Sequence, residues 1–546
     1  MNGKSRESRA ERTGWWIVFA LAFAAGIFLR CWQLGSQILL DDEWHAIQKL
    51  LYSSYADIAT HFGANDYCIP LTLYFRFLFD HGGLSDWGMR WPMLASGIAL
   101  IGIAPWLLRS YAGTPTLALC SGLLAISPLM VYHSRTARPY AITTLLVFFA
   151  IVAFFLWWRS RERRWAAVYV FATFLAGWLH LITLPFTLLP FAYFGCAVLW
   201  RGRAGIGDFM RLLLLGIVAA LALAVVLLPP LLTDMASLAG KSGHGVISVA
   251  SIYQSLLLAL GISAPWLLAV MLALALLGAW SLWRRDAGFA GYLLVVITGA
   301  AAAVLVARPA WVQHPGVLAR YLQPSLPFIL LFVAEGGACL LRLLPSSARA
   351  PIGLTAIVAL FMAGPIPGYA YFPNQFMGHP YFQYAYAPAD NPFRTTLPAG
   401  PIPDFYRRLA ALPPASLTLI EAPWSIRSDQ DPQVLYQAVH RQRILIGMVA
   451  PECGAPTYGQ YADNPGMRLR NFVHLSTLSS GTMAGADFLV VHLRPWLRPL
   501  PAAFWPDMAD CLPQIEARMG KPVYKDADIE VFALSATAHS IASTWR

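Results

Sequence analysis

Long apolar stretches recur along most of this chain, and no other feature of the sequence constrains its fold as strongly. About eleven of them lie between residues 15 and 368. Most are long enough for a helix to cross the roughly 30 Å apolar core of a bilayer. Only 12% of the residues are charged, about half the share found in soluble domains. The sequence therefore predicts an α-helical polytopic membrane protein with about eleven transmembrane helices.

The placement of the positive charges predicts which way the chain crosses the membrane. The N-terminal tail is basic, with Lys4, Arg6, Arg9 and Arg12, and four arginines lie within residues 159–164. Because cytoplasmic loops carry an excess of Lys and Arg, both segments are assigned to the cytoplasmic side. An odd number of spans then places the C-terminal region in the periplasm of a bacterial cell. This bias also explains the formal net charge of +11 without a nucleic-acid partner.

One apolar stretch, residues 251–283, is too long for one span and too short for two. Pro265 divides it into two parts. We expect a surface or re-entrant segment followed by a single span, because Arg284 and Arg285 then fall on the cytoplasmic side.

The composition changes near residue 370, where prolines and polar residues return. Short apolar runs typical of strands follow at 417–420, 444–449, 488–492 and 529–534. Helical patterns lie at 404–412 and 433–441. We therefore expect a membrane domain over 1–369, with 41–89 as a long first outer loop, and a soluble α/β domain over 370–546. Cys453 and Cys511 both lie in this domain, where a periplasmic location permits a disulfide; whether they pair is left open.

Three consecutive acids, Asp41, Asp42 and Glu43, follow the first apolar stretch on its outer side. One acid is explained by a helix N-cap, but three at a membrane boundary exceed that need. A carboxylate near a low-dielectric surface can accept a proton from a hydroxyl nucleophile. Asp42 is therefore the predicted catalytic base, with Glu43 second, and Asp41 and His45 are candidates for binding substrate. The pair Asp42 and Glu43 is also a candidate ligand set for Mg²⁺ or Mn²⁺.

Further candidates lie in other outer segments. Asp66 is a second carboxylate candidate, although a turn residue explains it equally. Arg135 and Arg138 precede one span and Arg320-Tyr321 opens another, on the side where basic residues are disfavoured. Arginine's planar fork suits a phosphate, whereas contact with lipid headgroups is the alternative explanation. Four more histidines fall on the outer face without metal-ligand spacing: His133, His180, His244 and His314.

The order of these features resembles a known family. An acidic pair opens a long outer loop, and three segments follow that are similar to motifs of bacterial members: Met89-Arg90-Trp91-Pro92, Arg138-Pro139-Tyr140-Ala141 and Arg320-Tyr321-Leu322-Gln323-Pro324-Ser325-Leu326-Pro327. The pattern resembles the GT-C superfamily of integral membrane glycosyltransferases over residues 1–345. Aminoarabinose transferases and protein O-mannosyltransferases are the most similar in layout. Two departures stand out: Tyr67-Cys68-Ile69-Pro70-Leu71 occupies the place of a His-Pro-Pro-Leu segment, and an additional Asp41 precedes the acidic pair.

The resemblance implies a function and a set of roles. In such enzymes a sugar is transferred from a polyprenyl phosphate or pyrophosphate to an acceptor hydroxyl, here on an envelope lipid, glycan or protein. Asp42 would be the base, with Glu43 assisting or binding a metal. Arg135, Arg138 and Arg320 would neutralise the phosphate leaving group, and attack from the opposite face would invert the anomeric centre. The C-terminal domain would lie over the active-site opening and contribute to acceptor specificity.

Two other functions are compatible with the sequence. A transporter or flippase of lipid-linked sugars would place its site near the bilayer midplane and show internal repeats. The charges gather instead at the outer boundary and no repeat is present, which favours the enzyme. A non-catalytic scaffold of an envelope complex is the third reading. The sugar, the acceptor, the carrier lipid, metal dependence and the oligomeric state are left open by the sequence.

Overall fold

The computed structural model describes residues 8–32, 34, 43, 54–62, 68–81, 86–240, 245–262, 264–310, 312–364, 366, 402–414, 416–422, 436, 439–448, 472–474, 486–493 and 508–545. The chain divides into two compact units. One unit comprises residues 1–32, 56–71 and 90–367, and the other comprises 33–55, 72–89 and 368–546.

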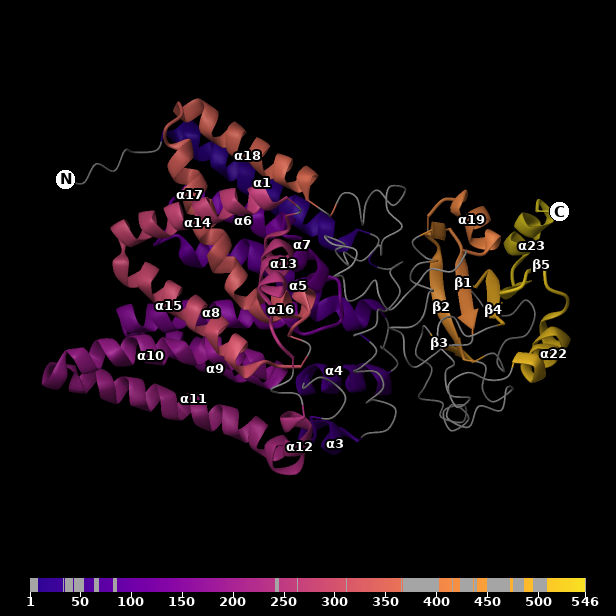
Figure 1. Cartoon of the computed structure of the whole chain (residues 1–546), viewed down its shortest axis with the longest axis horizontal. Helices are drawn as coiled ribbons and strands as arrows, with labels where there is room; N and C mark the ends of the chain where they lie inside the picture. Colours follow the sequence, from indigo (N-terminus) through magenta and orange to yellow (C-terminus); the bar gives the residue numbers. More distant parts are fainter. Residues whose placement is uncertain are drawn as a thin grey trace. The chain divides into compact units, whose positions relative to one another are not determined.

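The first unit is built from apolar helices (Figure 1). Its long helices are α1 (Arg9–Cys31), α5 (Asp86–Leu108), α8 (Tyr140–Ser160), α9 (Arg163–Leu179), α10 (Leu184–Trp200), α11 (Ile206–Thr233), α14 (Pro265–Arg285), α15 (Ala287–Ala307), α17 (Leu326–Leu341) and α18 (Ser346–Ala363). Shorter helices join them: α3 (Tyr55–Thr60), α4 (Ile69–Asp80), α6 (Thr114–Ile126), α7 (Pro128–Ser134), α12 (Met235–Ala239), α13 (Val249–Leu260) and α16 (Pro315–Leu322). Some residues of α4 and α5 belong to the second unit.

The described helices match the predicted spans. By length and composition nine of them can cross a membrane, and the bent pair α6 and α7 makes ten. The 17-residue α9 corresponds to the remaining predicted span, between α8 and α10. In the stretch that the sequence left ambiguous, the short α13 precedes the long α14, as expected. The polytopic fold is therefore confirmed.

One span differs from its prediction because it is not a straight helix. The predicted span over 115–131 is broken at Ser127, where α6 and α7 meet at 59°. Pro128 has no backbone N–H to donate to the carbonyl of Leu124, so a continuous helix would lose a hydrogen bond here. The break redirects α7 and the polar residues that follow it.

Close helix packing and a buried charge stabilise the end of the bundle that lies away from the break between α6 and α7. Gly278 of α14 and Gly336 of α17 face each other, and a Cβ at either position would collide with backbone atoms of the other helix. Nearby, the Glu335 side chain is fully buried. It accepts hydrogen bonds from Thr116 at 2.6 Å, Ser281 at 2.7 Å, Arg285 at 2.7 Å and Arg342 at 3.0 Å. This carboxylate therefore links α6, α14 and α17.

The second unit contains a six-stranded sheet in the order β3-β2-β1-β4-β6-β5 (Figure 1). The strands are β1 (Thr418–Ala422), β2 (Arg443–Met448), β3 (Phe472–His474), β4 (Phe488–His492), β5 (Tyr524–Lys525) and β6 (Ile529–Ala533). The first four run parallel, and β6 is antiparallel to both β4 and β5. Three helices accompany the sheet: α19 (Asp404–Ala410), α22 (Met508–Met519) and α23 (Ala536–Ser543).

Alternating residues of these strands build two cores. Ile420, Leu489 and Phe532 pack on one face with Cys511 and Ile515 of α22. On the other face, strand residues such as Leu419 and Val490 pack with α19 and α23. Four predicted strands and the helix over 404–412 are therefore present, whereas β3 and β5 were not predicted. Cys511 is disulfide-bonded; Cys453, whose pairing with Cys511 the sequence left open, lies outside the described residues.

Candidate functional site

Tyr140, the first residue of α8, is the centre of a cluster of charged and aromatic side chains. It is 3% exposed. The guanidinium carbons of two arginines lie near its ring centroid, Arg138 at 6.0 Å and Arg320 at 5.3 Å. The two arginines were predicted independently from distant segments of the sequence. The fold brings both of them to one ring, because Arg138 lies just before the start of α8 and Arg320 lies in the last turn of α16.

The rings of Tyr140, His180 and Tyr321 and the guanidinium of Arg320 form a closed circle in which each group contacts the next. Arg320 also lies 5.5 Å from the ring of Tyr321. His180, which follows α9, is 5.8 Å from Tyr140 on one side and 5.8 Å from Tyr321 on the other. The imidazole Nδ1 of His180 accepts the backbone N–H of Ile182 at 3.3 Å, which orients the ring. Aromatic faces attract cations, so the rings position the guanidinium group of Arg320.

A second histidine reaches Tyr140 from α7. His133 is 3% exposed, and its ring centroid lies 4.7 Å from that of Tyr140. Its Nδ1 is hydrogen-bonded to the Oε1 of Gln323, which belongs to the short helix η4 (Gln323–Ser325). Gln323 in turn donates to Thr144 at 3.1 Å. The cluster therefore combines residues of α7, α8, α16 and η4 with His180.

Arg135 has a different environment. One of its terminal nitrogens donates to three carbonyls at the end of α1, those of Leu29 at 3.2 Å, Arg30 at 3.2 Å and Trp32 at 2.7 Å. These contacts cap α1, whose last carbonyls have no intrahelical partner. The role in phosphate binding predicted for Arg135 stays a prediction, and its described contacts are structural.

Arg30 makes the reciprocal connection. It is 1% exposed, and its guanidinium donates to the carbonyls of Ala125 at 2.9 Å and Leu124 at 3.0 Å. Its Nε donates to Ser134 at 3.2 Å. Pro128 cannot donate to Leu124, so the arginine supplies the missing donor at the break. The two arginines together fix the end of α1 against α6 and α7, and thereby fix the start of the segment that carries Arg138.

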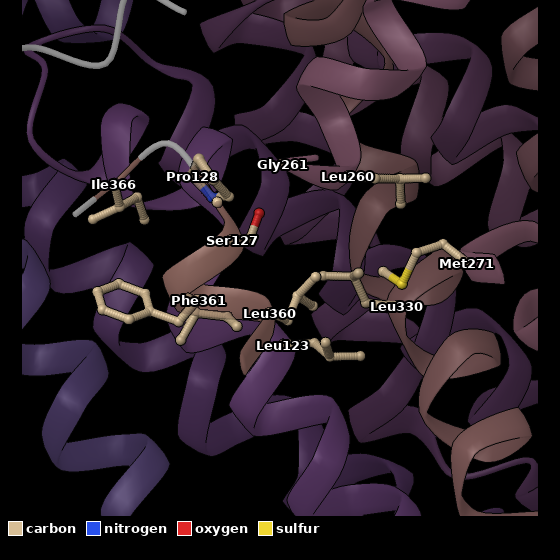
Figure 2. Close-up of a pocket in the computed structure, with 12 residues that line it drawn as sticks. Leu123, Ser127, Pro128, Leu260, Gly261, Met271, Leu330, Leu360, Phe361 and Ile366 are labelled. Atoms are coloured by element: carbon tan, nitrogen blue, oxygen red, sulfur yellow. The ribbon is translucent and has the colours of Figure 1, made fainter. Parts of the chain in front are cut away.

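A small cavity adjoins the same break at Ser127 and Pro128 (Figure 2). It measures about 10 Å³, which is room for about one water molecule. Its lining is apolar except for Ser127, whose hydroxyl is buried and has no hydrogen-bond partner among the described residues. Gly261 ends α13 here with φ 70°, and a Cβ at this position would collide with Pro128. The cavity is too small to hold a substrate.

The predicted acids are placed only in part. Glu43 is helical and completely buried, and it belongs to the second unit. Asp41, Asp42, His45 and Asp66 lie outside the described residues. Among the residues that are described, no group of three or more His, Cys, Asp or Glu side chains is arranged to hold a metal ion. The predicted metal site at Asp42 and Glu43 therefore stays a prediction.

The second unit contains a separate buried polar cluster at the carboxyl ends of β1 and β4. Glu421 accepts hydrogen bonds from Tyr406 at 2.9 Å and His492 at 2.5 Å. The Tyr406 ring stacks on Tyr436 at 4.5 Å and on His440 at 5.3 Å. Burial raises the pKa of Tyr406 well above its ordinary value and lowers the pKa of His440 to about 3. This histidine is therefore neutral at physiological pH.

Sequence reasoning missed several residues of the membrane cluster. Tyr140 was part of a motif but had no predicted role, and Gln323 was read only as part of the Arg-Tyr-Leu segment. Arg30 had no predicted role at all. Pro128 within an apolar run was a usable signal for the break. Nothing in the sequence indicated which distant charge would reach it.

No protein-family model matches the chain, and no curated protein matches it. Similar solved structures include ArnT from Cupriavidus metallidurans in the apo state. It has 13% identity and a TM-score of 0.49, over 96% of this chain and 99% of that chain. The same protein bound to undecaprenyl phosphate has 14% identity and a TM-score of 0.44, over 96% and 99%. The archaeal oligosaccharyltransferase AglB from Archaeoglobus fulgidus, in complex with an inhibitory peptide and a dolichol-phosphate, has 12% identity and a TM-score of 0.40, over 89% and 70%.

Proposed function

We propose that this chain is a glycosyltransferase that moves a sugar from a polyprenyl-phosphate donor to a hydroxyl of an envelope acceptor. The reaction would take place on the outer face of the bacterial cytoplasmic membrane. One observation carries the proposal: Arg138 and Arg320, from distant segments, lie within 6.0 Å of the same Tyr140 ring. A phosphate accepts charge-assisted hydrogen bonds from two such groups at once. The resemblance of the surrounding motifs to those of GT-C enzymes supports the same reading.

The chemistry follows from where charge develops. The acceptor oxygen forms a bond to the anomeric carbon while the bond from that carbon to the phosphate oxygen breaks. Polyprenyl phosphate leaves with the electron pair, and negative charge grows on it in the transition state. Arg138 and Arg320, held by the surrounding rings, stabilise that charge without reorganising at the moment of reaction. The hydroxyl proton goes to the carboxylate of Asp42, and attack opposite the phosphate inverts the anomeric centre.

A divalent Mg²⁺ or Mn²⁺ ion bound by Asp42 and Glu43 is a separate part of the proposed mechanism. Two carboxylates suit such a hard cation, and a bound ion would help to neutralise the negative charge of the phosphate. Its test is separate from that of the arginines. Transfer that survives EDTA treatment, and is not increased by adding back Mg²⁺ or Mn²⁺, contradicts a catalytic metal.

The function is tested by transfer in reconstituted membranes. The purified protein is supplied with undecaprenyl phosphates carrying radiolabelled glucose, mannose or aminoarabinose, together with an envelope extract as acceptor. Label should move from the donor lipid to a new product with at least one donor. Removing one group that stabilises transition-state charge costs about 100-fold in rate, so Arg320→Ala should lose roughly that factor.

A matched control is available at the other end of the bundle. Arg159 pairs with Asp286 at 3.0 Å, and its side chain is about half exposed, so Arg159→Ala should transfer at the wild-type rate. Equal rates for Arg320→Ala and Arg159→Ala would contradict the phosphate site. Movement of the lipid across the bilayer without cleavage of its sugar–phosphate bond would favour the transporter instead.

The predicted side of the C-terminal region has its own test. A reporter that is active only in the periplasm should be active when it is fused after Arg546.

A further inference from the structure

Three arginines surround Asp208 at the end of the helical bundle that the sequence assigns to the cytoplasm. Arg161 follows α8, Arg201 follows α10, and Arg211 belongs to α11, whose first turn contains Asp208. The Oδ1 of Asp208 accepts hydrogen bonds from Arg161 at 2.8 Å and Arg211 at 3.2 Å. Its Oδ2 lies 3.6 Å from the Nη1 of Arg201. Tyr140 begins the helix that ends before Arg161, so this arginine cluster is distant from the proposed phosphate site.

The arginine cluster has an excess of positive charge. Three guanidinium groups pair with one carboxylate, which leaves two positive charges uncompensated at this point. The neighbouring acids are engaged elsewhere, because Glu162 pairs with Arg164 and Asp286 pairs with Arg159 at 3.0 Å. The cluster is therefore electrostatically complementary to a ligand that carries two negative charges.

The arginines also have hydrogen-bond donors to offer. Arg201 and Arg211 are 57% and 58% exposed, and each contacts Asp208 through one terminal nitrogen. Arg161 lies deeper, with its guanidinium carbon 4.2 Å from the ring centroid of Trp158. Its Nη1 is buried and has no hydrogen-bond partner among the described residues. A buried donor without an acceptor is unfavourable, and an oxygen of an anion bound by the cluster would satisfy it.

The general bias toward basic cytoplasmic loops explains the charge of these residues but not their arrangement. That bias requires positive charge near the ends of spans, and it requires neither a shared carboxylate nor an aromatic ring beneath one guanidinium. Arg161 also has a φ of 62°, in the left-handed region where helices commonly end with glycine. An arginine at this position is strained, and such strain is typical of functional sites.

The surface beside the cluster is apolar. The helices α10 and α11 lie at one edge of the bundle (Figure 1). Large side chains next to the arginines are exposed on both helices, among them Leu199 and Trp200 of α10 and Met210 and Leu214 of α11. Tryptophan is enriched at the level of the lipid headgroups. A phosphate held by the arginines could therefore have its acyl chains packed on this surface, whereas a free phosphate ion would make no use of it.

We propose that the arginine cluster binds a phospholipid of the cytoplasmic leaflet whose headgroup carries two phosphates, as cardiolipin does. The two phosphates match the two uncompensated positive charges. Guanidinium groups bind phosphate oxygens through paired N–H donors, and basic pockets between membrane helices on the cytoplasmic side suit such headgroups. This site goes beyond the proposed glycosyl transfer and does not depend on it.

The test is native mass spectrometry of the full-length protein in detergent, with cardiolipin, phosphatidylglycerol and phosphatidylcholine supplied in turn at equal concentration. Wild type should retain cardiolipin most strongly and phosphatidylcholine least. Each arginine near a membrane surface contributes about fivefold to the affinity for an anionic lipid. Arg201→Gln and Arg211→Gln should therefore each weaken the retention of cardiolipin by about that factor.

Two further variants serve as controls. Arg109→Gln removes the same charge from another exposed arginine on the predicted cytoplasmic side, which lies over the ring of Trp106 at 4.9 Å; it should retain cardiolipin as wild type does. Arg161→Gly places a residue that accepts a positive φ at the end of α8. It should unfold near the wild-type temperature without added lipid, yet lose affinity for cardiolipin.

Four outcomes would overturn the proposal. The first is equal retention of cardiolipin by wild type, Arg201→Gln and Arg211→Gln. The second is an equal loss in Arg109→Gln, which would show diffuse attraction to the whole basic face. Retention of phosphatidylglycerol as strong as that of cardiolipin would rule out the two-phosphate headgroup. Displacement of the bound lipid by a large excess of inorganic phosphate would identify a site for the free ion instead. Sugar transfer is not part of the measurement, so the proposed function is tested independently.

Discussion

Replacing Arg30 by methionine should destabilise the membrane unit more than replacing an exposed arginine does. The side chain is 1% exposed and supplies donors to the carbonyls of Leu124 and Ala125 at the break between α6 and α7. Methionine fills a similar volume but donates nothing. A buried acceptor left without a donor costs about 1–3 kcal/mol, so two of them cost roughly 4 kcal/mol. Pro128 ensures that the backbone cannot take over at Leu124.

The measurement is thermal unfolding of purified protein in detergent, followed by tryptophan fluorescence at one scan rate. In a membrane unit of roughly 330 residues, roughly 4 kcal/mol corresponds to a lower unfolding temperature by about 6 °C. Arg159→Met is the matched control, because a half-exposed surface ion pair contributes at most about 1 kcal/mol. If Arg30→Met unfolds within about 2 °C of that control, the carbonyls have other donors and the reasoning is wrong. Arg30→Lys should fall between the two, since one ammonium cannot reach every acceptor.

Three further predictions concern other parts of the molecule. Glu335→Gln should lower the unfolding temperature through a loss of about 3 kcal/mol, because an amide places donors against donors at this buried site; an unchanged value would show that the partners rearrange freely. Gly278→Ala should prevent α14 from packing against α17, so it should reduce the yield of monodisperse protein, whereas Gly207→Ala, with open space around its Cβ position, should not. The pKa of His440 is about 3 instead of 6.5, so below pH 6.5 the unfolded chain binds a proton that the folded domain does not. The free energy of unfolding of this domain should therefore fall by about 3 kcal/mol between pH 6.5 and 4.5. Measured by hydrogen exchange of peptides from β1 and β6, it should fall less over this range in His440→Leu than in wild type. Parallel pH profiles of the two proteins would contradict this.

The spans were predictable because each carries its own signal. Hydropathy over about 20 residues needs no knowledge of neighbours. The sequence predicts spans at about 140–158 and 288–307, and the ends of α8 and α15 lie within two residues of these bounds. The strand over 488–492 was predicted for a similar reason, since four consecutive apolar residues, Phe488 to Val491, mark it locally. The two-residue β5 has no such signal, because its pairing with β6 alone defines it.

The site was predictable only in its charges. Arg138 and Arg320 were chosen because basic residues are disfavoured on the outer side, and the structure brings them to one ring. Tyr140 could not be singled out, since tyrosines at the ends of spans are ordinary in membrane proteins. Arg30 was given no role, because a charged residue at the end of a span is ordinarily explained by snorkelling. Its hydrogen-bond acceptors lie instead in a helix about a hundred residues away in the sequence.

The glycines that join α14 to α17 also have a consequence for motion within the bilayer. With backbone against backbone, no acyl chain can enter between these two helices, and neither can slide without the other. They should therefore move as one rigid body. Any sideways opening that admits a lipid from the membrane must occur at other helices, such as α11 and α18, which expose large apolar side chains including Leu232 and Met362.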